Sequence, residues 1–494
     1  MAQLLRRAAA RAGQRTAIVS GDARPTWSEL DAQVDAAAAG LRRRGLVPGD
    51  RVAIVLGNRL PFVVAWFAVL RAGLVAVPVN IAFTDREVAY QLRDCGARLV
   101  IVDEQRQPAL ASALAEAEQV IVPGDPDWHD LLQDAGTGDV PDPVGGEELA
   151  ALVYTSGSSG RPRGAMLSHR ALLANLSQLQ QTAVPVMTPD DVTLLVLPLF
   201  HIYALNAGLG SVVVHAATAV LVERFDPVLS LEVIQTERVT TVVGAPPMYV
   251  AWSMLPQLQE GFASVRLAVS GSAPLAPEVF RRMREITGRP VYEGYGMTEA
   301  SPVLTAAVVA DEPIPLSVGR ALPGVELRLQ AHSGPGAPEP GPGEAGEVVV
   351  RGANLFSGYW PDRHGGPDPD GWFATGDIAR IDTSGNVFLV DRLQDLILVS
   401  GFNVYPREVE AVLATHPDVA EVAVVGVSHP YTGEAVKAYV VPVEDAEPSA
   451  EELIDHAARS LARYKCPSSV QLVGSLPHVV KGKVAKGPLR EEAR

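Results

Sequence analysis

The chain has 494 residues, of which 47% are hydrophobic and 20% charged, a composition typical of a globular protein. One hydrophobic core rarely supports this length, so two or more domains are expected. The formal net charge of −16 argues against nucleic acid or an anionic membrane as a bulk partner, because both attract clustered cations.

The two cysteines, Cys95 and Cys466, lie far apart in the sequence. They indicate neither a disulfide framework nor a metal cluster, which fits a reducing, cytoplasmic location. Residues 1–7 lack the apolar core of a signal peptide. The apolar stretches 61–70 and 204–222 are too short or are interrupted by polar residues and glycine, so no transmembrane helix is expected.

Residues 1–150 alternate between helical and strand patterns, which predicts βαβ units around a mostly parallel sheet. Helices are expected at 28–41 and 61–71, and strands at 51–56, 75–79 and 98–102. The same rhythm continues further along the chain, where strands are expected at 149–153, 192–197, 219–222, 239–243 and 265–270. Two α/β layers are therefore predicted.

From about residue 315 the pattern changes to short strands, at 326–329, 346–351 and 385–390, separated by Gly, Pro and Asp turns. This is typical of a small antiparallel sheet or barrel. After Arg392 follow helices at 406–414 and 451–464, strands at 422–427 and 435–441, and a basic, glycine-hinged loop at 479–486.

The predicted class is therefore α/β. A large N-terminal domain, residues 1–393, contains two α/β subdomains and a small β-barrel. A small α+β C-terminal domain comprises residues 394–494, and its length of about 100 residues suffices for a separate unit.

A loop rich in Ser, Thr and Gly, residues 154–164, follows the apolar strand at 149–153. Its glycines let the backbone approach a ligand, and its hydroxyls and Arg161 and Arg163 supply donors, which suits a polyphosphate. Helical spacing over 165–174, with Ser168 as N-cap, places the loop between a strand and a helix. The alternative, a flexible linker, does not usually occupy such a position. The loop is not a Walker A motif, which requires a Gly-Lys-Ser/Thr sequence.

Four further stretches carry groups suited to nucleotide chemistry, and each has a plain structural alternative. The turn 270–274 follows a strand, where ligands of open α/β sheets bind, but it equally suits an ordinary strand-to-helix turn. In 292–299, Thr298 and Glu299 suit Mg²⁺ held partly through phosphates, or a helix N-terminus. Asp377, in 371–378, suits ribose hydroxyls or a turn. Arg392, in 391–402, suits a ribose or phosphate, or a surface ion pair.

Taken together and in this order, the five stretches resemble the adenylate-forming superfamily of acyl-CoA synthetases, luciferases and adenylation domains. The resemblance covers essentially the whole chain. Residues 154–164 resemble the phosphate loop, 295–299 the ATP/Mg²⁺ segment, and 375–377 the ribose-binding aspartate segment. Residues 391–402 resemble the hinge region, and 481–483 the loop that carries the adenylation lysine.

The resemblance implies an AMP-forming acid–CoA ligase that joins a carboxylic acid to ATP as an acyl adenylate and then transfers the acyl group to CoA. Its implied cofactors are ATP, Mg²⁺ and CoA, and no nucleic-acid partner is expected; a homodimer is left open. The implied nucleotide-binding residues are Thr155, Ser156, Gly157, Ser158, Ser159, Gly160, Arg163, Gly271, Ser272, Ala273, Pro274, Tyr295, Gly296, Met297, Asp377 and Arg392. Thr298 would contact the α-phosphate, and Glu299 would bind Mg²⁺.

Lys483 is implied to bridge the substrate carboxylate and the α-phosphate, and His201 to gate the acyl site. In the family the small domain rotates between the two half-reactions, and Gln394 aligns with its hinge residue. Ser400, Gly401 and Phe402 would then line the CoA channel, with Lys465 contacting CoA phosphates.

Three residues depart from the family pattern. Arg163 replaces the usual Lys, which keeps the charge but leaves the geometry open. Gln394 replaces Asp or Lys at the hinge, and Lys486 stands where Arg is common.

The acid is expected to lie near Tyr203, Asn206, Gly244, Ala245, Pro246 and Gly294. Gly294 argues against a dicarboxylate, since malonyl-CoA synthetases carry an arginine there. The apolar remainder favours a medium- or long-chain fatty acid. The alternative is an aryl or hydroxycinnamic acid, because residues 201–206 resemble the coumarate–CoA ligase sequence.

Two hypotheses from other functional classes remain open. One is an adenylation enzyme that loads a carrier protein, although no carrier domain is seen. The other is a nucleotide-binding scaffold without activity, against which the presence of Lys483, Glu299 and Asp377 argues.

Overall fold

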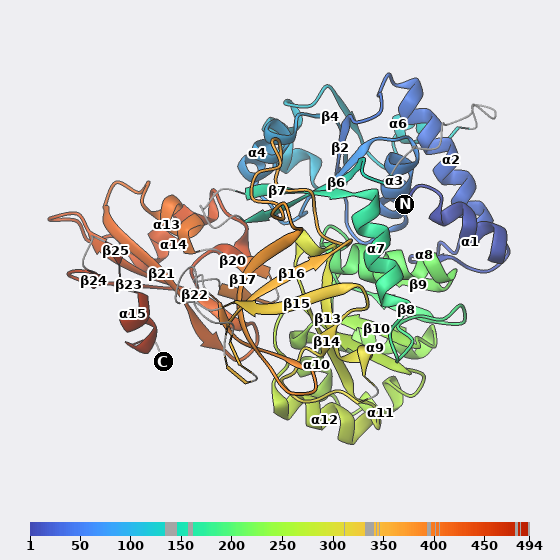
Figure 1. Cartoon of the computed structure of the whole chain (residues 1–494). Coiled ribbons are helices and arrows are strands. Elements are labelled where there is room, and N and C mark those ends of the chain that lie inside the picture. Colours follow the sequence, from blue (N-terminus) through green and yellow to red (C-terminus); the bar gives the residue numbers. More distant parts are fainter. Residues whose placement is uncertain are drawn as a thin grey trace.

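The computed structural model describes residues 1–133, 146–156, 162–310, 312–330, 340–341, 343–344, 346–392, 397–400, 402–404, 406–479, 483–484 and 486–492. It contains a large N-terminal part and a small C-terminal domain that lie side by side (Figure 1). The predicted α/β class is confirmed.

A six-stranded sheet has the order β5-β4-β2-β3-β6-β7. Its strands are β2 (Arg51–Val55), β3 (Val75–Pro78), β4 (Ala97–Val102), β5 (Gln119–Ile121), β6 (Leu149–Ser156) and β7 (Pro162–Ser168). The strands pair in parallel except for β6 and β7, which are antiparallel.

An eight-stranded sheet has the order β1-β9-β8-β10-β11-β12-β13-β14. Its strands are β1 (Ile18–Val19), β8 (Val192–Leu195), β9 (Thr218–Leu221), β10 (Thr241–Gly244), β11 (Leu267–Ser270), β12 (Val291–Gly296), β13 (Val303–Ala306) and β14 (Arg320–Ala321). The first six strands in this order pair in parallel, whereas β13 pairs antiparallel with β12 on one side and with β14 on the other.

The two sheets share a layer of helices between them. This layer contains α1 (Leu4–Ala12), α2 (Trp27–Arg43), α3 (Leu60–Arg71), α7 (His169–Leu179), the π-helical turn η2 (Tyr203–Gly210) and α8 (Ser211–His215). One hydrophobic cluster joins α3 to inward-facing residues of β2 and β9. Every residue from Phe62 to Arg71 in α3 is buried, which explains the long apolar run noted in the sequence.

Further helices cover the outer faces of the two sheets. On the six-stranded sheet these are α4 (Asp85–Cys95) and α5 (Ala111–Leu114), and on the eight-stranded sheet α9 (Pro227–Thr236), α10 (Pro246–Ser253), α11 (Leu258–Gly261) and α12 (Pro277–Thr287). The remaining short elements of this part are α6 (Pro126–Leu131), η1 (Gln107–Leu110), η3 (Thr298–Ala300) and η4 (Ala307–Val309).

Local sequence explains where helix α4 begins and ends. The Thr84 side chain accepts a hydrogen bond from the backbone N–H of Glu87, and the Glu87 carboxylate accepts one from the backbone N–H of Thr84, which forms a capping box. The helix ends at Gly96, whose φ of 61° lies in the left-handed region that glycine tolerates.

A four-stranded antiparallel sheet lies beside the larger sheets and has the order β15-β16-β17-β18. Its strands are β15 (Val325–Gln330), β16 (Gly346–Gly352), β17 (Trp372–Ile381) and β18 (Val387–Arg392). This is the small antiparallel unit that the short strands and turns predicted.

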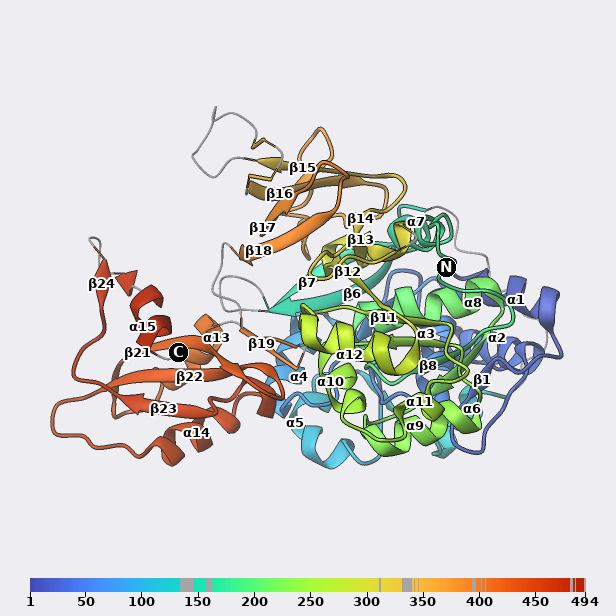
Figure 2. The same ribbon diagram turned by 90° about the horizontal axis from the view of Figure 1, so that it is seen from below.

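The C-terminal domain has hydrophobic clusters of its own. Its elements are β19 (Ile397–Val399), β20 (Phe402–Val404), α13 (Pro406–Leu413), β21 (Val419–His429), β22 (Gly433–Pro442), α14 (Ala450–Ala458), η5 (Arg463–Lys465), β23 (Ser469–Leu472), β24 (His478–Val479), β25 (Lys483–Val484) and α15 (Lys486–Glu492). Beside the large part lies the β19–β20 hairpin, of which Figure 1 labels β20 and Figure 2 labels β19. The β24–β25 hairpin lies on the opposite side of the domain. The domain boundary at residue 393 stays a prediction, because residues 393–396 lie outside the described residues.

One local prediction was wrong. The stretch from Ala165 to Leu167 belongs to strand β7 and not to a helix, so the phosphate loop connects two antiparallel strands. Pairing with β6 decides the conformation here, because a short apolar run does not distinguish a strand from a helix. The helix begins one turn later, at His169, and Ser168 caps it as predicted by accepting a hydrogen bond from Ala171 N at 3.2 Å.

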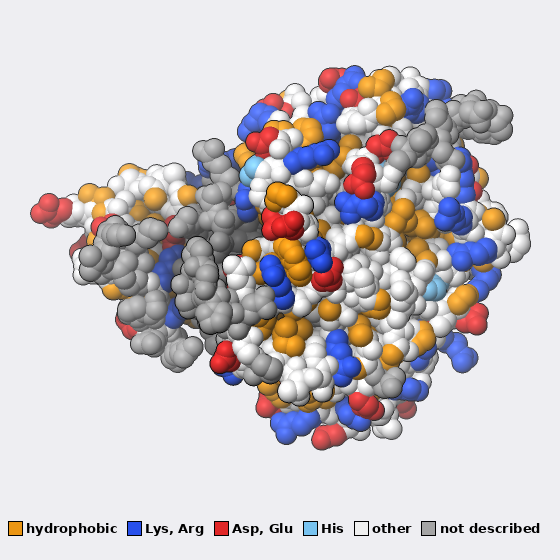
Figure 3. Space-filling view, viewed as in Figure 1, with side chains coloured by type: hydrophobic (Ala, Val, Ile, Leu, Met, Phe, Trp, Pro, Cys, Tyr) orange, Lys and Arg blue, Asp and Glu red, His pale blue; other side chains and the backbone are white. Residues whose placement is uncertain are grey.

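The surface is mixed in charge. On the face shown in Figure 3, basic and acidic side chains are interspersed. In the part of the chain that the structure describes, no helix has the length and apolarity needed to cross a membrane.

Candidate active site

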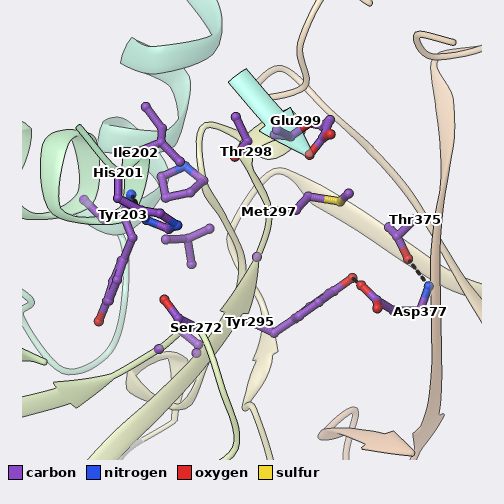
Figure 4. Close-up of a pocket in the computed structure, with 18 of the residues that line it drawn as sticks. His201, Ile202, Tyr203, Ser272, Tyr295, Met297, Thr298, Glu299, Thr375 and Asp377 are labelled. Atoms are coloured by element: carbon purple, nitrogen blue, oxygen red, sulfur yellow. Dashed lines mark hydrogen bonds between the residues drawn. The ribbon is translucent and has the colours of Figure 1, made fainter. Parts of the chain in front are cut away.

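A cavity of about 500 Å³ opens where the three sheets of the large part meet. Its wall includes Thr155 and Arg163 from the six-stranded sheet, Ser272 and Thr298 from the loops of the eight-stranded sheet, and Asp377 from β17. Figure 4 shows that Ser272, Thr298 and Asp377, from three separate segments, surround one space. This matches the general rule that ligands bind at the carboxyl ends of parallel strands.

The phosphate-loop side of the cavity is defined by its two flanking strands. Thr155, near the end of β6, and Arg163, in β7, are cross-strand partners and both line the cavity. Arg163 Nε is buried and has no hydrogen-bond partner among the described residues, so this cation is suited to an anionic ligand. Gly157, Ser158, Ser159 and Gly160 and the side chain of Ser156 lie outside the described residues.

The turn after β11 forms another wall. Gly271 and Ser272 line the cavity, whereas Ala273 and Pro274, also predicted to contact the nucleotide, are not part of its lining. A Cβ atom at Gly271 would lie 3.0 Å from the ring of Tyr203. Glycine is therefore required here for the aromatic ring to pack against the turn.

Tyr295 and Asp377 join the eight-stranded sheet to the four-stranded sheet. Tyr295 Oη donates a hydrogen bond to Asp377 Oδ2 at 2.7 Å, and Figure 4 shows the ring pointing across the cavity to the carboxylate. Asp377 is directly paired with Arg392 on the neighbouring strand β18. The two residues predicted to hold a ribose are thus neighbours in the sheet, although the Arg392 side chain is outside the described residues.

Glu299 follows Thr298 at the cavity wall and is 5% exposed. Burial raises the pKa of Glu299 above its ordinary value, while a hydrogen bond from Tyr359 Oη, 2.6 Å from Oε1, lowers it in part. Among the described residues no group of three or more His, Cys, Asp or Glu side chains could hold a metal ion. A single carboxylate fits Mg²⁺, which commonly takes one or two carboxylates together with substrate phosphates.

His201 and Tyr203 lie together on the side of the cavity opposite Asp377 (Figure 4). Desolvation lowers the pKa of His201 to about 4, so the imidazole is uncharged at neutral pH. Desolvation also raises the pKa of the Tyr203 hydroxyl. No hydrogen bond of this hydroxyl to another described residue is present, which makes it a polar group available to a ligand.

The predicted acid-binding residues divide into two groups. Tyr203 and Gly294 line the cavity, whereas Asn206, Gly244, Ala245 and Pro246 do not. Asn206 is buried behind the wall, where its amide donates to Leu172 O at 3.0 Å and Ser301 O at 2.7 Å. The ring of Tyr249 packs against Gly244.

Sequence reasoning missed several lining residues. Apolar examples are Leu179, Val186, Ala207, Val243, Val269, Pro302, Val303, Ala306 and Val308. They come from segments without any local motif and are brought together by the tertiary structure. Glu293 was not missed in this way, because the acid was expected near the pair Glu293–Gly294. It lines the cavity, and its carboxylate accepts a hydrogen bond from Leu275 N at 2.9 Å. Desolvation raises the pKa of Glu293 to about 7.

The predicted C-terminal residues fall on opposite sides of the small domain. Ser400 and Phe402 belong to the β19–β20 hairpin beside the large part, whereas Lys483 is in β25 on the side away from it (Figure 1). The Lys483 side chain, Gly401 and Gln394 lie outside the described residues. Lys465 is buried in ion pairs with Glu408 and Glu87, so in this arrangement its amino group is not exposed to a CoA phosphate.

Comparison with known proteins shows matches over nearly the whole chain. The AMP-binding enzyme model matches residues 5–360, and the AMP-binding enzyme C-terminal domain model matches residues 408–483. A feruloyl-CoA synthase from Amycolatopsis sp is 38% identical over 486 residues, which cover 96% of this chain and 95% of that protein. A long-chain-fatty-acid–CoA ligase from Bacillus subtilis is 31% identical over 526 residues, covering 99% of this chain and 94% of that protein.

Solved structures agree with these matches. The amide bond synthetase McbA from Marinactinospora thermotolerans superposes with a TM-score of 0.89 at 29% identity, and the match covers 99% of each chain. An o-succinylbenzoate CoA synthetase from Bacillus subtilis superposes with a TM-score of 0.87 at 28% identity, covering 99% of this chain and 98% of that one.

The fold is that of adenylate-forming enzymes. The chain belongs to the AMP-binding enzyme family.

Proposed function

We propose that this chain, an AMP-forming acid–CoA ligase, activates an aromatic acid that carries a ring hydroxyl, of the hydroxycinnamate kind. The observation that supports this most directly is Tyr203, a half-buried residue of the cavity wall whose hydroxyl makes no hydrogen bond to another described residue. This hydroxyl can therefore donate a hydrogen bond to a ligand or accept one from it. A phenolic acid offers both a ring to pack beside Tyr203 and a hydroxyl to pair with it.

The size of the cavity also favours a compact acid. The volume of about 500 Å³ includes the space beside Asp377 and Gly271 that the nucleotide would take. Binding pockets of this order hold molecules of drug size, so little room is left for an extended chain. This changes the order of the two acids that the sequence suggested. Similarity to a feruloyl-CoA synthase over nearly the whole chain supports the aromatic acid.

A fatty acid is the second candidate. The apolar side chains of Leu179, Val186 and Val308 line the cavity and would suit a short aliphatic chain. Similarity to long-chain-fatty-acid–CoA ligases supports this candidate. Neither the nucleotide-binding groups nor the CoA step distinguishes the two acids, so the acid itself must be tested.

In the proposed reaction the acid's carboxylate oxygen attacks the α-phosphorus of ATP, and the bond to the β-phosphate oxygen breaks to release pyrophosphate. The thiol of CoA then attacks the acyl carbonyl, loses its proton, and displaces AMP. Catalysis of the first step is mainly positioning and charge stabilisation. Arg163 and Thr155 would hold phosphates, Asp377 the ribose, and Thr298 the α-phosphate. Glu299 would hold Mg²⁺, which when bound neutralises phosphate charge.

The proposal is tested by AMP and pyrophosphate release with and without CoA, using acetate, malonate, octanoate, palmitate, cinnamate and 4-coumarate. We expect CoA-dependent turnover to be highest on 4-coumarate and at least tenfold lower on cinnamate, which lacks the hydroxyl. Tyr203→Phe should remove this preference while leaving turnover of cinnamate within about threefold.

Other outcomes have definite meanings. A maximum on octanoate or palmitate would replace the aromatic acid with the fatty acid. Adenylate formation that CoA does not resolve would indicate a carrier-protein-loading enzyme. Absence of pyrophosphate release with every acid would contradict the proposed acids altogether.

The proposed ribose contact gives a separate prediction. Asp377→Ala should weaken AMP binding by about 10- to 100-fold, because hydrogen bonds to a charged group contribute roughly 1.5 to 3 kcal/mol. Isothermal titration with AMP measures this directly and needs no acid. Tyr295→Phe is the control for the neighbouring ring, since it removes the 2.7 Å hydrogen bond to Asp377 but keeps the carboxylate. Unchanged AMP affinity in Asp377→Ala would show that the ribose binds elsewhere.

A further inference from the structure

The loop that follows β16 is hydrogen-bonded to β7, the strand that follows the phosphate loop. Trp360 N donates a hydrogen bond to Gly164 O at 2.9 Å, and Met166 N donates to Gly358 O at 3.0 Å. Phe356 N donates to Glu299 O at 2.8 Å. These backbone contacts fix Tyr359 between β7 and the segment that carries Glu299.

Tyr359 contacts two charged side chains through different parts of its own side chain. The guanidinium of Arg163 lies over the ring face, with Cζ 3.9 Å from the ring centroid. The hydroxyl donates its hydrogen bond to Glu299 Oε1 at 2.6 Å. Tyr359 is 6% exposed and lines the cavity. Its hydrogen bond to Glu299 joins two buried side chains, and the low local dielectric strengthens it.

The identity of residue 163 gives this arrangement a specific reason. The family resemblance implied a lysine at this position of the phosphate loop, and the sequence has arginine there. A planar guanidinium stacks on an aromatic face in a way that the compact ammonium group of lysine does not. The ring of Tyr359 therefore explains why arginine, and not lysine, stands at position 163.

We propose that Tyr359 is a positioning residue that couples Arg163 to Glu299, so that the phosphate-binding cation and the carboxylate suited to Mg²⁺ are oriented together. The proposal rests on the proposed function of this cavity as a nucleotide site. The ring of Tyr359 holds Arg163 toward the phosphates, and the hydroxyl of Tyr359 fixes the rotamer of the Glu299 carboxylate. Tyr359 itself takes no part in the chemistry.

The buried state of Glu299 explains why such a donor is needed. A carboxylate that is removed from water without a partner is strongly disfavoured, and Glu299 is 5% exposed. The Tyr359 hydroxyl supplies the partner, 2.6 Å from Glu299 Oε1, and holds the carboxylate in one orientation at the cavity wall. Loss of this hydroxyl should therefore weaken the response to Mg²⁺ more than the binding of the nucleoside.

The test is nucleotide binding by isothermal titration to Tyr359→Phe, which keeps the ring but removes the hydroxyl. We expect ATP affinity in Mg²⁺ to fall about tenfold, while AMP affinity in EDTA stays within about twofold. The gain in ATP affinity on adding Mg²⁺ should shrink accordingly. Tyr439→Phe is a matched control, because it removes a buried tyrosine hydroxyl hydrogen bond to a backbone oxygen, at 3.0 Å, in the C-terminal domain.

A second variant tests the coupling itself. Arg163→Lys keeps the charge but not the planar stack, and we expect a similar loss of Mg–ATP affinity. If the two residues act together, the double variant should lose less than the product of the two single losses. Independent, multiplicative losses, or a Tyr359→Phe variant that binds Mg–ATP like the wild type, would overturn the proposal. An equal loss of AMP affinity would also overturn it, since this would indicate general damage to the cavity.

These binding measurements are independent of the acid. If the cavity binds neither AMP nor ATP in the unmodified chain, the proposed function fails. If the unmodified chain binds both and the variants behave like it, the coupling alone fails.

Discussion

Replacing Lys483 with alanine should lower the rate of acid-dependent pyrophosphate release by about 10²- to 10³-fold, the usual cost of removing one preorganised group that stabilises transition-state charge. Lysine is expected to act where the substrate carboxylate and the α-phosphate bring negative charges together. The measurement is a rapid-quench assay of pyrophosphate with saturating ATP and acid. Reaction of a preformed acyl adenylate with CoA should remain within about threefold of the wild-type rate.

The control for this prediction is Lys437→Ala, which removes another lysine of the C-terminal domain, one that lies over the ring of Tyr439. It should change neither half-reaction by more than about twofold. The arrangement in Figures 1 and 2 has β25, which carries Lys483, on the side of the domain away from the large part. A large effect would therefore require a second domain orientation. Unchanged adenylate formation in Lys483→Ala would contradict our assignment of this residue.

The sequence predicted most of the fold because its signals are local and repeated. The apolar strands and amphipathic helices of the α/β part recur at regular intervals, and helix caps such as Ser168 can be read from neighbouring residues. The error at Ala165–Leu167 shows the limit of this reasoning. A short apolar run adopts the structure of the strand that it pairs with, and β6 decided it here.

The candidate site was predicted in part, through residues that belong to recognisable motifs. Asp377 and Arg392 were suggested separately, and the structure shows that they are paired across two strands, in a register shifted by an irregularity between Ile378 and Ala379. No sequence pattern reveals such a register. Tyr359 was missed because an isolated tyrosine in a loop has no motif, and its role follows from contacts with residues far away in the chain.

Lys465 is another residue whose contacts with distant parts of the chain no sequence pattern reveals. It gives the second prediction with a large expected effect. Its amino group lies 2.8 Å from Glu408 Oε1 in the C-terminal domain and 3.1 Å from Glu87 Oε1 in helix α4 of the large part. Its side chain is 3% exposed and its ammonium group lies 4.6 Å from the ring centroid of Phe83. The ion pair thus holds the small domain in the orientation that places the β19–β20 hairpin beside the large part.

Lys465→Met should slow the reaction of preformed acyl adenylate with CoA at least tenfold and leave the acid-dependent burst of pyrophosphate unchanged. Removing one partner of a buried ion pair typically costs about 3 to 5 kcal/mol. If about 1.4 kcal/mol of this cost shifts the equilibrium between the two domain orientations, the population of the orientation seen here falls tenfold. The two half-reactions are measured separately by stopped-flow mixing with CoA and by quench-flow without it.

Lys465 also pairs with Glu408 inside its own domain, so a second variant is needed to separate domain orientation from domain stability. Glu87→Gln removes only the charge on the large part, and glutamine can still accept the capping hydrogen bond from Thr84 N. This variant should slow the CoA step in the same direction, with a smaller effect. Arg86→Ala, which removes an exposed hydrogen bond from Arg86 to Ser460 of the small domain, is the matched control.

The same pair of variants decides between this role and the contact with CoA phosphates that the family resemblance suggested. If Lys465 binds CoA directly, Lys465→Met should raise the KM for CoA, and Glu87→Gln should lower that KM by releasing the amino group. If Lys465 holds the domain orientation, both substitutions should lower the maximal rate of the CoA step, because each removes one half of the same ion pair. Opposite effects of the two substitutions would therefore contradict the orientation role, and parallel losses would contradict the phosphate contact.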